Sequence, residues 1–203
     1  KYDNVHVIYS ETNDFINEIT CKAKLLKKAK QEQSDADWFF WMDGDTLVEG
    51  QLTRPILNQY LANVGEDGVK FGHLNLWRSD TWTRLDDGFH GLHTNGVLCM
   101  WRNKEDLAFP EQEGLHHAQH PLQVYTSTRA PYSLIHRGFA TDESIIRKYN
   151  TYKERGQTGW ALERLLNEET LKVTKVEGFL PDWFVPDEKN PTTKKKLREI
   201  YDG

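Results

Sequence analysis

The chain has 203 residues, a length that suits one domain with a substantial buried core. Its net charge of −5 argues against general nucleic-acid binding, and no apolar stretch approaches the roughly 20 residues needed to span a bilayer. Cys21 and Cys99 are too few for a disulfide framework, so we expect reduced thiols in a cytoplasmic protein. The oligomeric state does not follow from the sequence.

The first half of the chain predicts strands and helices in alternation. Apolar residues recur with the period of a strand or of a helix, and Asn13-Asp14 is suited to begin the first helix. The expected elements are a strand at 5–9, a helix from 13 to about 30, a strand at 38–48, a helix at 51–63 and a strand at 69–77.

The second half of the chain predicts a mixed, loop-rich region. Two polar and aromatic loops, 78–95 and 103–121, are long for a compact domain, and such loops usually carry function. Together with the first half, this order predicts an α/β sandwich whose site lies at the tips of the strands. The other expected elements are strands at 97–101, 132–136 and 171–176, helices at 142–153 and 159–167, and a polar tail at 181–203.

Two carboxylates follow the most apolar run of the chain. Residues 38–42 (WFFWM) lead directly into Asp43 and Asp45, which predicts a strand buried on both faces, as in parallel sheets, that ends in an acidic pair. Ligands bind at the carboxyl ends of such strands, and hard divalent cations prefer oxygen ligands and bridge to phosphates. We therefore expect a metal–phosphate site here, whereas the second Asp-x-Asp, at 35–37, lies in a polar turn.

Several segments resemble family-2-type glycosyltransferases with the GT-A fold. The nucleotide-binding half is matched at 2–9 (YDNVHVIY), 21–29 (CKAKLLKKA) and 41–45 (WMDGD). A second block is matched at 77–88 (WRSDTWTRLDDG), 100–102 (MWR), 114–121 (GLHHAQHP) and 136–152 (HRGFATDESIIRKYNTY). The family has one more strand and helix before Asp3, and two aspartates where this chain has Ser10-Glu11.

The resemblance implies a single GT-A-like domain over 1–180, with a mixed, mostly parallel sheet flanked by helices and without the usual first strand. Its nucleotide and metal half would span 1–76, and its acceptor half 77–180. The implied reaction moves a sugar from a UDP- or GDP-linked donor to a hydroxyl of a carbohydrate or glycan acceptor. Mn²⁺ or Mg²⁺ would stabilise the departing diphosphate.

The resemblance also implies roles for particular residues. Asp45 would bind the metal directly, His136 would complete the metal shell, and Asp43 would hold the ribose or the metal through water. A carboxylate is also needed to deprotonate an acceptor hydroxyl in an inverting transferase. The candidates for this base are Asp80, Asp86 and Asp87, with Asp142 and Glu143 as alternatives, and the further candidates for donor contacts are Lys24, Arg84 and Arg137.

Three other interpretations remain open from the sequence. His116, His117 and His120 invite a zinc site, but they lack the Glu of a His-Glu-x-x-His helix. A haloacid-dehalogenase-like phosphatase would have Asp43 as its nucleophile, although its motif is one residue short here. A non-catalytic sugar- or nucleotide-sugar-binding domain would also use aromatic loops and a metal site.

Overall fold

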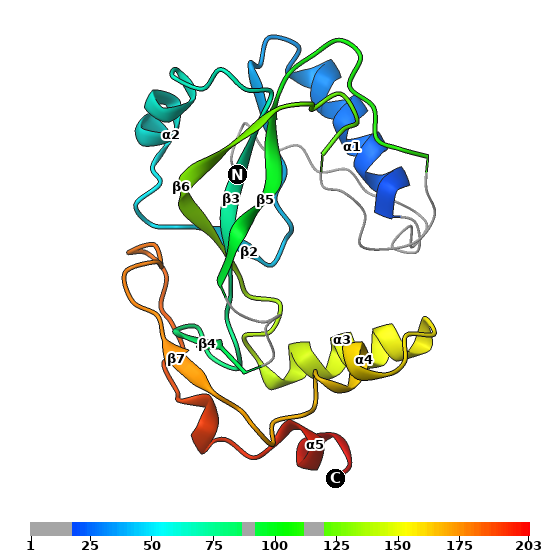
Figure 1. Ribbon diagram of the computed structural model, residues 1–203, viewed down its shortest axis with the longest axis vertical. Coiled ribbons are helices and arrows are strands. Elements are labelled where there is room, and N and C mark those ends of the chain that lie inside the picture. Colours follow the sequence, from blue (N-terminus) through cyan, green and yellow to red (C-terminus); the bar gives the residue numbers. More distant parts are fainter. Residues whose placement is uncertain (1–17, 87–91, 112–119) are drawn as a thin grey trace. The chain divides into compact units, whose positions relative to one another are not determined.

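The computed structural model describes residues 18–86, 92–111 and 120–203, and it is a mixed α/β protein (Figure 1). The strand expected at 5–9 and the cap expected at 13–14 lie outside these residues. The chain divides into two compact units, which differ from the halves expected at 1–76 and 77–180. Unit 1 comprises Lys1–Trp41, Glu66–Val69 and Leu98–Thr128, and unit 2 comprises Met42–Gly65, Lys70–Val97 and Arg129–Gly203.

The main sheet has five strands in the order β1-β5-β3-β6-β2. Three of these strands, β3, β5 and β6, pass through both units. The strands are β1 (Trp38–Phe40), β2 (Thr46–Val48), β3 (Gly68–Asn75), β5 (Leu92–Arg102) and β6 (Ser127–His136).

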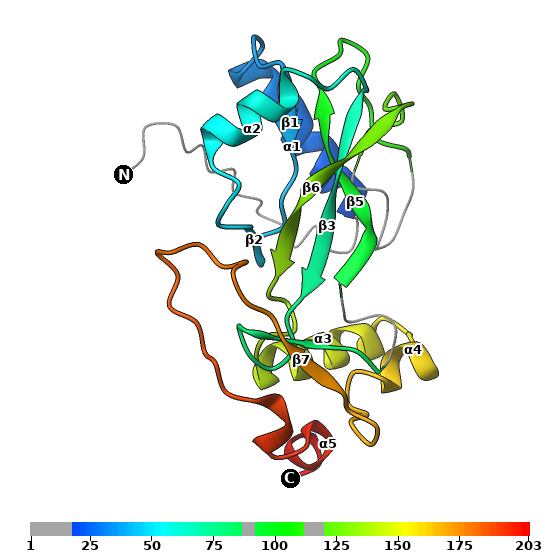
Figure 2. The same ribbon diagram turned by 60° about the vertical axis from the view of Figure 1, so that its left-hand side comes forward.

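The expectation of a mostly parallel sheet is wrong. Strand β1 pairs with β5, and β2 with β6, in antiparallel fashion. Strands β3 and β6 run in the same direction (Figure 2), as shown by the hydrogen bonds from Gly68 N to Thr126 O and from Leu76 N to His136 O, both 3.0 Å long. The sheet is mixed because β3 and β6 are parallel, whereas the edge strands β1 and β2 are antiparallel to their neighbours.

The apolar run at 38–42 is not a strand buried on both faces. All three residues of β1 are half-buried, and the guanidinium of Arg102 lies 4.5 Å from the centre of the Trp38 ring. The expected strand at 38–48 is interrupted by a turn, in which Thr46 N donates to Asp43 O at 3.0 Å, and β2 begins after it. Bulky aromatic residues thus line an edge strand, where a cation–π contact covers one of their rings.

Helices α2 (Arg54–Leu61) and α3 (Asp142–Glu154) lie close to their predicted positions, whereas the helix expected at 159–167 covers only Trp160–Glu163. Helix α2 has Pro55 in its first turn, where a missing N–H is tolerated, and α3 begins with a capping box between Thr141 and Ser144.

The loop expected at 78–95 contains β4 (Trp82–Arg84), which pairs with β7 (Val173–Lys175) in a second, antiparallel sheet. The remaining helices are α1 (Glu18–Glu32), α4 (Trp160–Glu163), the 3-10 helix η2 (Pro191–Thr193) and α5 (Leu197–Tyr201).

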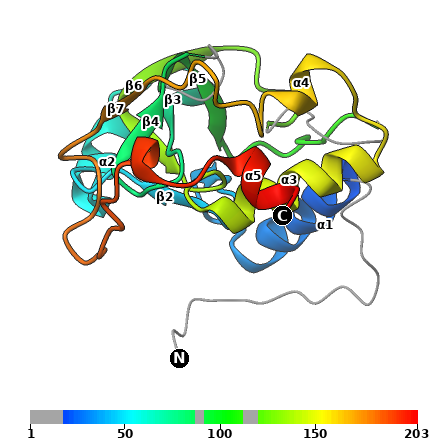
Figure 3. The same cartoon turned by 90° about the horizontal axis from the view of Figure 1, so that it is seen from below.

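Each unit has its own apolar core. In unit 1, residues of α1 pack with Trp101, Phe109 and Val124. In unit 2, α3 packs with α4 and α5, and Leu197 of α5 is fully buried among them. Figure 3 shows α5 alongside α3. Residues 181–203, expected as a polar tail, therefore contribute to the core of unit 2.

Candidate functional site

Three polar side chains converge at one place in unit 2. Asp45 comes from the turn before β2, His136 ends β6, and Lys148 lies in the middle of α3. The Oδ2 atom of Asp45 lies 3.3 Å from His136 Nε2 and 3.3 Å from Lys148 Nζ. Lys148 Nζ also lies 3.4 Å from His136 Nε2, so the three atoms form a nearly equilateral triangle.

The pairing of β2 with β6 brings Asp45 to His136. Thr46 is the partner of His136 in the strand register, which leaves Asp45 one residue beyond it at the end of the ladder. The backbone N–H of Arg137 donates to the carbonyl oxygen of Asp45 at 2.8 Å. Main-chain pairing therefore sets the distance between the turn that carries Asp45 and the end of β6, independently of any side-chain contact.

Two residues of β3 orient the imidazole of His136. Asn75 Oδ1 lies 2.7 Å from His136 Nδ1, and the ring of His73 stacks on the His136 ring with 5.1 Å between their centres. His73 and Asn75 are two residues apart, so they lie on the same face of the strand. With Nδ1 donating to Asn75, the ring directs Nε2 at the triangle, an orientation typical of metal-binding histidines.

Gly138 leaves the space in which the three polar atoms meet. A Cβ atom at this position would lie 2.1 Å from Lys148 Nζ, 2.4 Å from His136 Nε2 and 2.6 Å from Asp45 Oδ2. The next residue, Phe139, supplies an aromatic wall, with its ring centre 4.5 Å from Lys148 Nζ and 5.2 Å from the centre of the His136 ring. The site is thus a small cradle with a backbone floor, which any larger residue at 138 would fill.

The surroundings keep Asp45 ionised. The hydrogen bond from His136 is the main cause that holds the pKa of Asp45 far below its usual value, and the charges of His136 and Lys148 act in the same direction. Partial burial opposes this shift, since it disfavours the charged carboxylate. The result is a carboxylate with a permanent negative charge that faces two nitrogen atoms.

The donor set suits a divalent cation. Two neighbouring ligands of an octahedral ion, each bound at about 2.1 Å, are about 3 Å apart, which is close to the separation of Asp45 Oδ2 and His136 Nε2. An imidazole nitrogen and a carboxylate are both accepted by Mn²⁺. Asp43 is exposed in the same turn, and within 18–86, 92–111 and 120–203 no three His, Cys, Asp or Glu side chains are grouped to hold an ion. Among the described residues, Asp45 and His136 are therefore the pair whose spacing suits an ion.

Asp80 is buried and pairs with the half-buried Arg137. Asp80 Oδ1 accepts a hydrogen bond from Arg137 Nε at 2.8 Å, and its Oδ2 accepts one from the backbone N–H of Asp187 at 3.0 Å. The guanidinium of Arg137 also lies 4.6 Å from the centre of the Phe184 ring. These contacts tie the end of β6 to the C-terminal segment, which favours a structural role for both residues over a base and a phosphate contact.

Asp86 and Arg84 form a second pair, and both of its side chains are buried. Two guanidinium nitrogens of Arg84 donate to Asp86 at 3.0 and 2.9 Å, and Lys172 N donates to the same carboxylate at 3.1 Å. Arg84 also donates to the carbonyl oxygens of Arg164 and Asn167. Burial alone would raise the pKa of Asp86, but these hydrogen bonds outweigh it and lower that pKa. A carboxylate with this pKa and these partners is a weak candidate for a general base.

The other candidates from the sequence lie elsewhere. Asp87, His116 and His117 are outside the described residues. His120 is at the edge of the described chain, where its Nδ1 lies 3.0 Å from the carbonyl oxygen of Pro121. His120 belongs to no group of three His, Cys, Asp or Glu side chains among the described residues.

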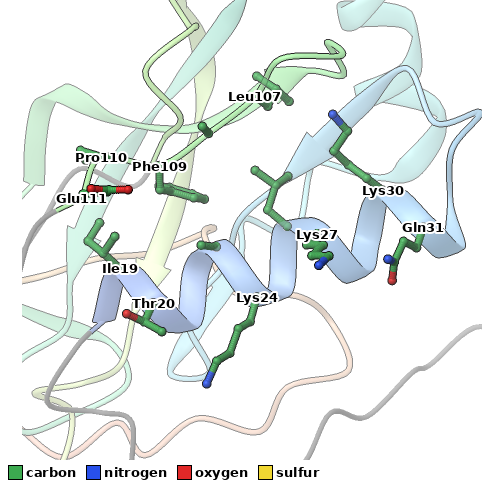
Figure 4. A pocket seen from close by; sticks show the side chains of 13 residues that line it. Ile19, Thr20, Lys24, Lys27, Lys30, Gln31, Leu107, Phe109, Pro110 and Glu111 are labelled. Carbon is green, nitrogen blue, oxygen red and sulfur yellow. The ribbon is translucent and has the colours of Figure 1, made fainter.

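Figure 4 shows a hollow in unit 1 between α1 and the segment 107–111, with a volume of about 960 Å³. Lys24, expected to contact the donor, lines this hollow together with Lys30. Lys30 Nζ donates to the carbonyl oxygens of Lys104 and Glu105 at 2.8 and 2.6 Å, which joins α1 to the neighbouring loop. All residues that line the hollow belong to unit 1, whereas Asp45, His136 and Lys148 belong to unit 2.

Arg78 is a buried residue that the sequence did not single out. It has a positive φ of 52°, and its guanidinium donates to Asp142 at 2.7 and 3.1 Å and to Glu168 at 2.9 and 3.0 Å. Since Asp142 opens α3, this network fixes the start of the helix that carries Lys148. It also explains why Asp142, an alternative candidate for the base, is already paired.

Comparisons of the chain with protein-family models, with curated proteins and with solved structures give no match. Within the described part of the chain, no helix combines the length and the apolar character needed to cross a membrane.

Proposed function

We propose that this protein is a metal-dependent glycosyltransferase, which moves a sugar from a nucleoside-diphosphate sugar to a hydroxyl of a glycan acceptor. One observation carries the proposal. Asp45 and His136, which lie far apart in the sequence, place a carboxylate oxygen and an imidazole nitrogen 3.3 Å apart at one end of the sheet in unit 2. The resemblance of the segments around both residues to the GT-A family supports the choice of reaction.

In this proposal, Asp45 and His136 would hold Mn²⁺ or Mg²⁺. When bound, such an ion acts as a Lewis acid that stabilises the negative charge of the departing diphosphate. Asn75 keeps the Nε2 atom of His136 directed at the cradle, and Gly138 keeps the cradle open. The exposed carboxylate of Asp43, in the same turn as Asp45, would contact the ribose of the donor.

The acceptor hydroxyl needs a base. Asp80 and Asp86 already accept hydrogen bonds from Arg137 and Arg84, so their oxygens are engaged. Of the three carboxylates that the sequence suggests for this role, Asp87 is therefore the one to test first. Its substitution by Asn is expected to lower turnover without weakening the binding of a nucleoside diphosphate.

The test of the proposal is hydrolysis and transfer of UDP- and GDP-linked sugars in the presence of Mn²⁺. Asp45→Asn and His136→Ala are each expected to lower turnover by at least 100-fold while the circular dichroism spectrum is kept, because each removes one of two protein ligands. Asp35→Asn, in the other Asp-x-Asp of the chain, is the matched control and is expected to retain activity. Full activity in both Asp45→Asn and His136→Ala would contradict the proposed site.

A sugar- or nucleotide-sugar-binding domain without catalysis is the second candidate. It is favoured by the contact between Lys148 and Asp45, which gives the carboxylate a charged partner within the protein. Binding of nucleotide sugars without turnover, across a broad panel of donors and acceptors, would support this candidate. Cleavage of a generic phosphate ester would instead indicate a phosphatase.

A further inference from the structure

We infer that Lys148 is a built-in cation of the site, and that a divalent metal binds to Asp45 and His136 only by displacing its ammonium group. This inference rests on the proposed function, and it adds a residue that controls how tightly the site holds its metal. Lys148 has no role among the expectations from the sequence, because a lysine on a helix surface is usually solvated.

The position of the ammonium group is the first argument. Lys148 Nζ contacts Asp45 Oδ2 at 3.3 Å and lies 3.4 Å from His136 Nε2, so it lies beside the two atoms that would bind a metal. The backbone at Gly138 closes one side of this space, since even a methyl group there would collide with all three atoms. A metal bound to both ligands therefore has to use the space that the ammonium group now occupies.

The charges are the second argument. An ammonium group supplies three hydrogen-bond donors and no acceptor, so it suits the anionic oxygen of Asp45 in the same way that a metal ion does. Two cations that share one carboxylate repel each other strongly at such short range. The ammonium group and the metal are consequently alternatives, and each weakens the binding of the other.

The mobility of the side chain is the third argument. Helix α3 is anchored through the buried residues Ile145 and Tyr149, but the side chain of Lys148 is 21% exposed, and its four-carbon stem has a way out toward solvent. Retreat of the ammonium group thus needs no movement of the helix. Displacement would leave a positive charge at the edge of the site, where an anionic diphosphate would provide a new partner.

The experiment measures binding of Mn²⁺ alone, by electron paramagnetic resonance of the free ion, to the full chain and to Lys148→Met. Methionine keeps an unbranched apolar stem against Phe139 and removes the charge. We expect the affinity for Mn²⁺ to rise about tenfold, the effect of one unit charge a few ångströms away in water-like surroundings. Lys153→Met is the matched control, because it removes an exposed lysine from the same helix, and it should change the affinity by less than twofold.

The outcomes separate this inference from the proposed function. Tighter binding in Lys148→Met, lost when Asp45→Asn is added, supports both. Equal or weaker binding in Lys148→Met, with binding to the unmodified chain still abolished by Asp45→Asn, overturns the displacement by metal and leaves the metal site intact. Absence of any binding that depends on Asp45 overturns both.

Discussion

Replacing Gly138 by alanine tests the geometry of the cradle with the smallest possible change. The added methyl group would lie between 2.1 and 2.6 Å from Lys148 Nζ, His136 Nε2 and Asp45 Oδ2. Each atom has to retreat by about 1 Å to restore an ordinary carbon contact. Lys148 and Asp45 can adjust at the ends of their side chains, but the contact of His136 Nδ1 with Asn75 restrains the imidazole ring.

The expected magnitudes follow from these contacts. Overpacking of a site costs about 1–3 kcal/mol. We expect Gly138→Ala to lie near the lower limit, because the ends of the Lys148 and Asp45 side chains can move. This cost corresponds to a melting temperature lower by about 2–4 °C. The turnover rate should fall by about 100-fold, because a displacement of reacting groups by about 1 Å lowers rates by about that factor. Binding of Mn²⁺ should also weaken, because the methyl group fills the space between the ligands.

Three measurements check this prediction. They are thermal unfolding by circular dichroism, binding of Mn²⁺, and turnover of the UDP- or GDP-linked sugar on which the unmodified chain acts. Gly44→Ala is the matched control, since a Cβ there meets no atom within 4 Å although Gly44 lies between Asp43 and Asp45. The reasoning is refuted if Gly138→Ala binds Mn²⁺ as tightly as the unmodified chain. It is also refuted if Gly44→Ala loses as much affinity as Gly138→Ala.

Two further predictions concern stability. Arg78→Met leaves the buried Glu168 without its positively charged partner, so we expect a loss of about 3–5 kcal/mol in urea unfolding. Arg198→Met, at an exposed pair, should cost less than about 1 kcal/mol, and equal losses would contradict the importance of burial. Asp86 has a lowered pKa in the folded protein. Its ionised form therefore contributes to the free energy of unfolding at pH values above the ordinary pKa of about 3.9, and this contribution is lost as the pH falls below that value. Unfolding followed from pH 5 to pH 2 should therefore show a shallower loss of stability in Asp86→Asn than in the unmodified chain, and an unchanged slope would argue against that lowered pKa.

The sequence predicted the local elements better than their pairing. The periodic runs at 51–63 and 142–153 became α2 and α3, since an amphipathic pattern with a proline or a cap at its start carries enough local information. The strand at 38–48 was misjudged, because an apolar run does not reveal whether a strand lies at the edge or in the middle of a sheet. The antiparallel pairing with β5 follows from contacts between residues far apart in the chain.

The same limit applies to the site. Asp45 and His136 were both expected from short motifs, and the structure brings them together through the register of β2 and β6. Lys148 was missed although a signal existed, because it follows Ile145 by three residues and precedes Tyr149, which puts it near the buried face of α3. The partners of Arg78 could not be inferred, since Glu168 and Asp142 approach it only after the chain has folded.

Helix α3 limits where residues can be inserted into this protein or deleted from it. Its first turn is fixed by the contact of Asp142 with Arg78, and the ammonium group of Lys148 reaches Asp45 from the second turn. One residue inserted between 142 and 148 would rotate the lysine by about 100° around the helix axis and direct it away from the carboxylate. Insertions and deletions are therefore excluded from this short interval, while the turn after Glu154 has room to accept them.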